Sequence, residues 1–243
     1  LFQVPLVQTF AAKKAASYLS KELGVPITVK SLEIDFWNLI ILENLYVEDK
    51  RQDTLLYLGR LNVGINELDF SDKEVGMFLH FMNPYAKTYL GKEDLTYNHQ
   101  FLVDYFSSTD TTKSKTIWKV NLYGIRVSNG TYLFEDDNKA KLEYGVDYFH
   151  LKADSIQVLV EEIEFNGDSI GLKLNNLSLI EQSGFYLTEL TAKTKIYPGT
   201  IDFKQLRIVT GKSIIRGSYS MQAPNFSNYL NYNQKVEMVA NLN

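Results

Sequence analysis

Residues 155–174, SIQVLVEEIEFNGDSIGLKL, set the fold class of this chain. Apolar side chains recur at every second position of 156–160 and again of 170–174. Between them lies Asn166-Gly167, a dipeptide that accepts the positive φ angles of a tight hairpin turn. A period of two on both sides of a short turn predicts two antiparallel strands, because parallel neighbours need a longer crossover.

The same pattern continues in both directions from this hairpin. It predicts strands at 119–127, 131–134, 148–153, 155–165, 170–179, 185–196, 201–209 and 213–221. Most junctions carry a turn dipeptide, namely Asn129-Gly130, Asn166-Gly167, Ser183-Gly184, Pro198-Gly199 and Thr210-Gly211. The sequence therefore predicts a mostly β, long antiparallel sheet and argues against β-α-β units with parallel strands.

The N-terminal part adds one helix and further strands. Residues 5–23 place Val7, Phe10, Ala11 and Tyr18 at helical spacing on an apolar side, and Gly24 supplies a stop signal. Alternation then predicts strands within 27–34, 39–47 and 61–66. Residues 74–89 are apolar on several sides without clean alternation, which predicts a strand followed by an irregular connection.

Composition limits the possible functions. The chain has 243 residues, a net charge of -4 and no cysteine, and 13% of its residues are aromatic. A mildly acidic chain without a basic cluster lacks the electrostatic signature of nucleic-acid binding, so we expect no nucleic-acid partner. The lack of cysteine removes disulfides, thiolate metal sites and cysteine nucleophiles. The aromatic share favours strands.

The sequence carries no recognisable catalytic or metal-binding motif. His80, His99 and His150 are far apart, and none has the spacing of a metal site. Gly-rich phosphate loops and nucleophile elbows are also missing from the sequence. We therefore predict no catalytic residues, no metal and no cofactor, and expect a protein that is not an enzyme.

The one-sided strands provide candidate binding residues instead. Their apolar positions could line a continuous groove, and the candidate lining residues are Leu61, Val63, Ile65, Ile156, Val158, Val160, Ile170, Leu172, Leu174, Ile201, Phe203 and Ile215. Lys173, Lys193 and Lys195 then fall on the opposite, water-facing side. The same alternation is also typical of a closed β-sandwich or of a sheet covered by helices.

The N-terminal third resembles a known family. The residues concerned are Pro5–Thr9, Ser20–Gly24, Ile27–Ile34, Ile41–Asp49, Asp53–Leu56 and Leu61–Val63. In this order they are similar to the N-terminal region of AsmA/TamB-type envelope proteins, especially the Bacteroidota branch of translocation and assembly module (TamB) proteins. The resemblance is specific over about 4–70 and only architectural beyond.

The resemblance implies a fold, a location and a role. It implies that 25–243 form the N-terminal part of a continuing, strongly twisted, taco-shaped β-groove. A membrane-proximal helix at 1–24 and a transmembrane anchor upstream would precede this groove. Such a protein would extend from the bacterial inner membrane through the periplasm. It would conduct bound phospholipid to the outer membrane, assist outer-membrane protein assembly and secretion with a TamA-like outer-membrane β-barrel partner, or do both. The alternative is an envelope or extracellular β-sandwich that binds a protein or glycan by its surface.

Overall fold

The structure, a computed structural model, describes residues 5–35, 38–92, 96–107, 118–224 and 236–243. The elements are α1 (Pro5–Leu23), β1 (Ile27–Thr28), β2 (Ser31–Asp35), β3 (Leu39–Glu48), β4 (Thr54–Asp69), β5 (Glu74–Leu90), α2 (Gln100–Ser107), β6 (Lys119–Asp136), β7 (His150–Asn166), β8 (Ser169–Glu181), β9 (Tyr186–Tyr197), β10 (Thr200–Thr210), β11 (Ile214–Gln222) and β12 (Glu237–Leu242). The predicted mostly β chain with an N-terminal helix is thus confirmed.

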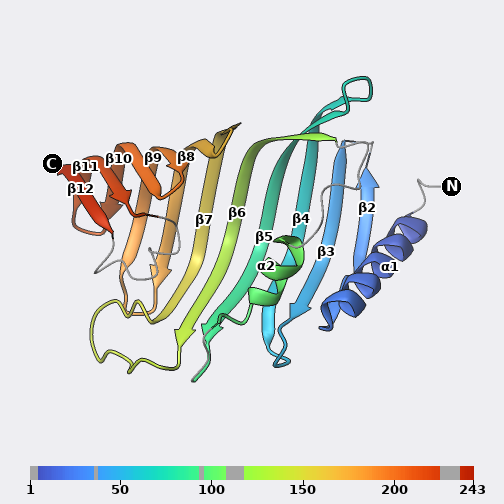
Figure 1. Cartoon of the computed structure of the whole chain (residues 1–243), viewed down its shortest axis with the longest axis horizontal. Helices are drawn as coiled ribbons and strands as arrows, with labels where there is room; N and C mark the ends of the chain where they lie inside the picture. The colour runs from blue at the N-terminus through green and yellow to red at the C-terminus, as the bar shows by residue number, and fades with distance from the viewer. Residues whose placement is uncertain (1–4, 36–37, 93–95, 108–117, 225–235) are drawn as a thin grey trace.

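All described strands belong to a single sheet. Its order is β1-β3-β4-β5-β6-β7-β8-β9-β10-β11-β12, and β2 pairs with β3 beside β1. Strands from β3 to β12 therefore follow one another across the sheet in chain order (Figure 1). A two-sheet β-sandwich, the alternative fold, is not what these strands form.

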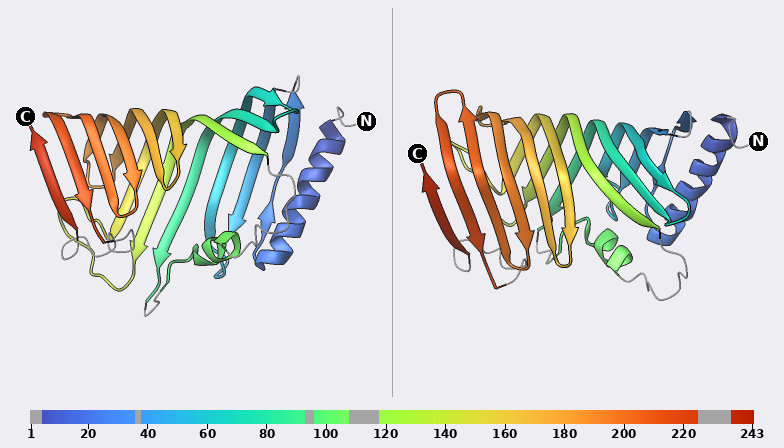
Figure 2. Two further views of the ribbon diagram at one scale, coloured as in Figure 1. Left: turned by 45° about the horizontal axis from the view of Figure 1, so that its top comes forward. Right: turned by 90° about the horizontal axis from the view of Figure 1, so that it is seen from above.

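The sheet is twisted and mostly open. The ribbon of β6 bends strongly near its upper end in Figure 1, and the views in Figure 2 show a sheet that is curled rather than flat. Each described strand has its main contacts with its neighbours in the sheet, and α1 lies at the β2 edge. This open, curled sheet agrees with the predicted β-groove.

One pair of strands breaks the antiparallel rule. β5 and β6 are parallel, with Leu79 beside Ile125 and Phe81 beside Val127. The connection from Leu90 to Lys119 includes α2 and is long enough to return the chain to the starting end of β5. The expectation that the sequence contains no parallel β-α-β connection was wrong here, because it rested on the short turns of the C-terminal half.

A row of unusual backbone conformations crosses the middle of the sheet. Asn44, Asn83, Asn129 and Ser155, on β3, β5, β6 and β7, have φ angles of 48°, 50°, 56° and 54°. Asn129 was predicted to lie in a turn between two strands, but it sits within the single strand β6. The predicted strands 148–153 and 155–165 likewise form one strand, β7. These predictions were wrong because a left-handed residue serves equally in a turn or in a β-bulge.

The left-handed residues shift the phase of side-chain alternation by one. A Cβ placed on Gly130 would lie 3.1 Å from Val127, 3.3 Å from Pro84 and 3.4 Å from Ile156, so these three side chains share a face. Val127 precedes the left-handed residue Asn129 on β6, whereas Pro84 follows the left-handed residue Asn83 on β5. The apolar residues therefore stay on one face through the bend. The irregular pattern at 74–89 reflects this shift within one strand, β5.

Asn83 provides a test of this row. Replacing Asn83 with Val puts a β-branched residue at φ 50° and should lower the free energy of unfolding by about 1–2 kcal/mol. Asn83→Gly should change it by only a few tenths of a kcal/mol, since glycine adopts this φ freely. Urea titration measures the free energy of unfolding of both variants. Asn176→Val on β8, at a residue without a positive φ angle, is the control, and an equal loss there would argue against a backbone effect.

Helix α1 ends where the sequence predicted but packs on a different side. Gln8, Ala16 and Leu23 are buried, whereas Phe10 and Tyr18 are exposed. The Gln8 Oε1 atom accepts a hydrogen bond from Ile34 N at 2.9 Å, and Thr9 Oγ1 accepts one from Leu32 N at 3.2 Å. Polar side chains thus satisfy the edge of β2, which apolar ones could not do. Phe10, Ala11 and Tyr18 of the predicted apolar side face away from the sheet, whereas Val7 is partly buried.

Candidate functional site

Continuous apolar rows run across the sheet on one face. Side chains of paired residues point to the same face of a sheet. The pairing connects one row from β4 to β9, which consists of Val63, Leu79, Ile125, Val160, Leu174 and Ala192. A second row consists of Leu61, Phe81, Val127, Val158 and Leu177. We call the face that carries these rows the apolar face.

All twelve candidate lining residues belong to the apolar face. Leu61, Val63, Val158, Val160 and Leu174 are members of the two rows. The others are joined to them by strand alternation or by pairs such as Ile170 with Ile196, Ile196 with Ile201, Leu172 with Thr194, Thr194 with Phe203, and Ile208 with Ile215. That they contact lipid remains a prediction.

Sequence reasoning missed part of this face. Leu79 and Phe81 on β5, and Ile125 and Val127 on β6, fill the centre of both rows. β5 had no clean alternation in the sequence because Asn83 shifts its phase. An asparagine directly before Pro84 was the available signal, since proline inside a sheet is typical of bulges.

On β9, the apolar face is the shielded side of the sheet. Along β9, Ala192 and Thr194 are only 4% and 7% exposed. Lys193, which lies between them, and Lys195, which follows Thr194, are exposed. All twelve candidate lining residues are partly buried, although no second layer of described strands packs over them. Neighbouring side chains of the apolar face therefore shelter one another.

The opposite face is polar and bears ion pairs. Glu43 lies 3.9 Å from Arg60 and 3.5 Å from Lys30, and Lys173 lies 3.1 Å from Glu162. Arg207 pairs with Glu189. Hydrogen bonds from Ser31 and the nearby lysine lower the pKa of the Glu43 carboxyl. The two faces of the sheet therefore differ sharply in polarity, as the sequence predicted for Lys173, Lys193 and Lys195.

One polar group interrupts the apolar face on β9. Thr194 is 7% exposed, and its Oγ1 has no hydrogen-bond partner among the described residues. It lies between Leu172 and Phe203, and Phe203 stacks on Tyr219 with ring centroids 6.3 Å apart. A buried hydroxyl without a hydrogen-bond partner is costly, so Thr194 is a locally unfavourable residue of this face.

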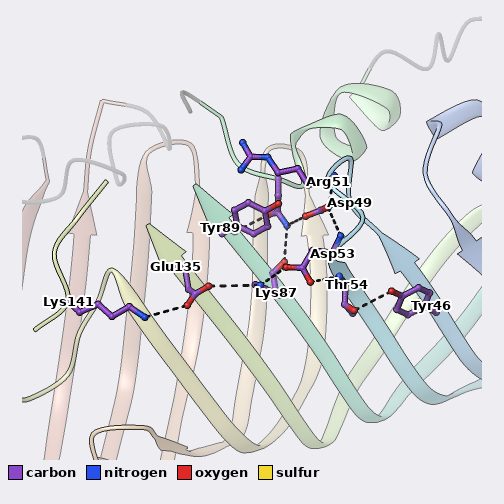
Figure 3. Close-up of polar contacts among 10 residues, drawn as sticks. Tyr46, Asp49, Arg51, Asp53, Thr54, Lys87, Tyr89, Glu135 and Lys141 are labelled. Carbon is purple, nitrogen blue, oxygen red and sulfur yellow. Dashed lines mark hydrogen bonds and ion pairs between the residues drawn. The ribbon is translucent and has the colours of Figure 1, made fainter. Parts of the chain in front are cut away.

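A dense polar cluster fixes the rim where β3 turns into β4 (Figure 3). Asp49 is 1% exposed, and its Oδ1 accepts hydrogen bonds from Arg51 N at 2.8 Å and Asp53 N at 3.0 Å. Its Oδ2 accepts one from Asn98 Nδ2 at 3.0 Å. Asn98 also binds the backbone of Tyr89 and so ties the segment before α2 to β5. The cluster holds the segment around Asn98, directly before α2, against the rim of the sheet.

Charged side chains extend this rim cluster across three strands. Lys87 binds Asp53 and lies 4.0 Å from Glu135, which in turn lies 3.8 Å from Lys141 (Figure 3). The hydrogen bond from Lys87 to Asp53 raises the pKa of the lysine. Burial, with the hydrogen bond to Asp49, raises the pKa of Tyr89 to about 12. These charged groups bind one another, so we assign them a role in holding the rim together rather than in binding a ligand.

The three histidines lie apart in the fold as in the sequence. His80 Nε2 lies 2.8 Å from Ser128 Oγ, His150 Nδ1 lies 3.0 Å from Asp147 Oδ2, and the ring of His99 stacks on Tyr97. Within the described ranges, no three His, Asp or Glu side chains gather closely enough to hold a metal ion. His150 borders a hollow of about 380 Å³ that is lined mainly by the 141–147 segment.

Three of the four helix residues singled out in the sequence are exposed. Phe10 and Tyr18 are 62% and 60% exposed, Ala11 is exposed, and Val7 is partly buried. None of the described helices is both long and apolar enough to cross a bilayer. Their role next to a membrane thus stays a prediction.

Comparison with known proteins adds no relative. No family model matches the chain, and no curated protein matches its sequence.

Proposed function

We propose that this chain is a non-enzymatic envelope protein whose apolar face conducts phospholipids between membranes. The observation that carries the proposal is the row from Val63 to Ala192, which is apolar at each of its six strands. A track of this kind is what an acyl chain needs to leave a bilayer without entering water.

The energetics favour a continuous track over separate pockets. Exposure of an acyl chain costs about 0.8 kcal/mol per CH₂, so a long chain costs on the order of ten kcal/mol. The strands from β3 to β12 span roughly 43 Å at about 4.8 Å per spacing. One leaflet of hydrocarbon is about 15 Å thick. The apolar face is therefore longer than one lipid chain, as a conduit requires.

The resemblance to AsmA/TamB-type proteins supports the same location. With it, the proposal includes an inner-membrane anchor, a path through the periplasm and a TamA-like β-barrel partner in the outer membrane. A surface-binding sandwich module is the weaker reading, because the described strands form one open sheet and the apolar side chains are partly exposed.

Assistance of outer-membrane protein assembly is a second candidate. This candidate comes from the resemblance to AsmA/TamB-type proteins, and it would use the same apolar face for a different cargo.

Native mass spectrometry of the gently extracted chain tests the lipid proposal. We expect at least one phospholipid per chain, because the apolar face would otherwise be in contact with water. Organic extraction and phosphate analysis give an independent count. A folded chain, with β-sheet circular dichroism, that repeatedly lacks phospholipid would contradict the proposal. Capture of an unfolded β-barrel precursor in its place would favour the assembly role.

A further inference from the structure

A hollow lies at the rim of the sheet, beside the connection from β6 to β7. It is enclosed by the 141–147 segment and by Gln182 and Ser183 of the β8–β9 turn, and its volume is about 380 Å³. We call it the rim hollow. Ligand pockets measure about 300–1,000 Å³, so the rim hollow suits a small molecule or a single side chain.

The rim hollow is separate from the apolar face. Gly130 belongs to the apolar face, whereas Leu133 and Glu135, which border the hollow, alternate to the other side of β6. Glu135 pairs with His150 on β7, so these two side chains share the polar face. A ligand of the hollow would therefore not compete with lipid on the apolar face.

His150 is fixed in the wall of the rim hollow. It is 6% exposed, and its Nδ1 atom lies 3.0 Å from Asp147 Oδ2. Hydrogen bonds from Leu142 N and Phe149 N also reach the Asp147 carboxylate and hold its pKa below the ordinary value. An ionised carboxylate only accepts hydrogen bonds, so Nδ1 carries the proton and Nε2 of the neutral ring is an acceptor.

Hydrogen-bond acceptors prevail in the hollow. Nε2 of His150 has no hydrogen-bond partner among the described residues, and it is not sealed from solvent. Gln182 donates from its own Nε2 to the His150 carbonyl, which leaves Gln182 Oε1 as a second acceptor. The Glu143 carboxylate, which is exposed and unpaired within the described ranges, is a third. A ligand of the hollow must therefore supply donors.

The charge of the hollow selects a cation as this donor. Its border carries three carboxylates, those of Glu135, Glu143 and Asp147, and one lysine, Lys141. Lys141 lies 3.8 Å from Glu135, so it does not balance the other two carboxylates (Figure 3). Nowhere in the described part of the chain do three His, Asp or Glu side chains form a group that could hold a metal ion. Tyr144, which is 87% exposed at the border, adds an aromatic ring of the kind that attracts ammonium groups.

We propose that the rim hollow binds a primary ammonium group. The ammonium donates hydrogen bonds to His150 Nε2, Gln182 Oε1 and the Glu143 carboxylate, and the Tyr144 ring lies against it. A free amine or the lysine side chain of a partner protein carries this group. The proposal does not depend on the lipid conduit.

Calorimetric titration of the chain with butylamine tests the proposal, and butanol is the matched probe without the charge. We expect butylamine to bind at least about tenfold more tightly, because hydrogen bonds to charged groups are the stronger ones. Glu143→Gln and Tyr144→Leu should each weaken butylamine binding about threefold. The matched controls are Asp137→Asn and Tyr148→Leu, which alter exposed residues of the same connection that do not border the hollow.

Nitrogen-15 NMR of the His150 ring gives a readout that needs no variant. At about pH 8 we expect a protonated Nδ1 and a bare Nε2, and the Nε2 signal should shift when butylamine is added. Spermidine and a lysine blocked at both its α-amino and carboxyl groups then separate the two sources. Tighter binding of spermidine assigns the hollow to a free amine, and tighter binding of the blocked lysine assigns it to a protein side chain.

Three results would overturn the ammonium proposal. The first is equal binding of butylamine and butanol, and the second is an equal effect of Glu143→Gln and Asp137→Asn. The third is a protonated Nε2 at about pH 8 together with tighter binding of acetate than of butylamine, which would make the hollow an anion site. Because Glu143 and Tyr144 are exposed, circular dichroism should show both variants folded.

Discussion

The Val158→Asp variant should bind at least about tenfold less phospholipid than the wild-type chain. Val158 lies in the row between Val127 and Leu177, and its side chain is only partly exposed. A carboxylate there would have to lose water when an acyl chain lies over it, and an unpaired charge in an apolar environment costs several kcal/mol. Phosphate analysis after organic extraction measures the loss, and circular dichroism tests the fold.

Leu159 on the same strand offers a matched control. It follows Val158 directly but points to the polar face, where it pairs with Arg126 and Asn176. Leu159→Asp should therefore keep the lipid content, because the new carboxylate faces water and lies near Arg126. Equal lipid loss in both variants would show that any charge on β7 disturbs the sheet. Global unfolding of Val158→Asp alone would point to a closed core at this position, against the open groove.

The Asp49→Ala variant should lower the free energy of unfolding by about 3 kcal/mol. The Asp49 carboxylate is 1% exposed and accepts hydrogen bonds from two backbone amides of its own turn and from Asn98. Its removal leaves three part-buried donors without this partner and unties the segment before α2 from the β3–β4 turn. Urea or thermal unfolding measures the loss.

Asp69 provides the control for Asp49, because it makes the same kind of turn at the opposite rim. Its Oδ1 atom accepts hydrogen bonds from Ser71 N and Asp72 N, both exposed. Asp69→Ala should cost less than about 1 kcal/mol, since water replaces the carboxylate. If both alanine variants lost the same stability, the link between Asp49 and Asn98 would not matter.

The stability contributed by Asp49 should also depend on pH. Burial opposes ionisation of this carboxyl, but the hydrogen bonds from Asn98, Asp53, Tyr89 and Arg51 outweigh it and hold its pKa below the ordinary value of 3.8. A group with a lowered folded-state pKa stabilises the fold above its unfolded pKa, and the contribution is lost as the pH falls through the folded pKa. The difference between wild type and Asp49→Asn should therefore be full at neutral pH and shrink below about pH 4.

Much of the fold could be predicted from local patterns in the sequence. Four of the five turn dipeptides, including Asn166-Gly167 and Pro198-Gly199, do connect neighbouring strands. The helix was predicted with its correct ends, Pro5 and Leu23. The candidate lining residues were also found to share one face. These features depend on alternation and turn chemistry within a few residues of chain.

The sequence by itself thus determined which residues form strands and which side chains of one strand share a face, because both follow from a period of two. Only the tertiary structure decided how strands combine. It placed Leu79 and Ile125 in one row, shifted the phase at Asn83, brought Asn98 to Asp49 and turned Phe10 outward. These results depend on register, on a parallel crossover and on the need of the β2 edge for polar partners, all of which join residues far apart in the chain.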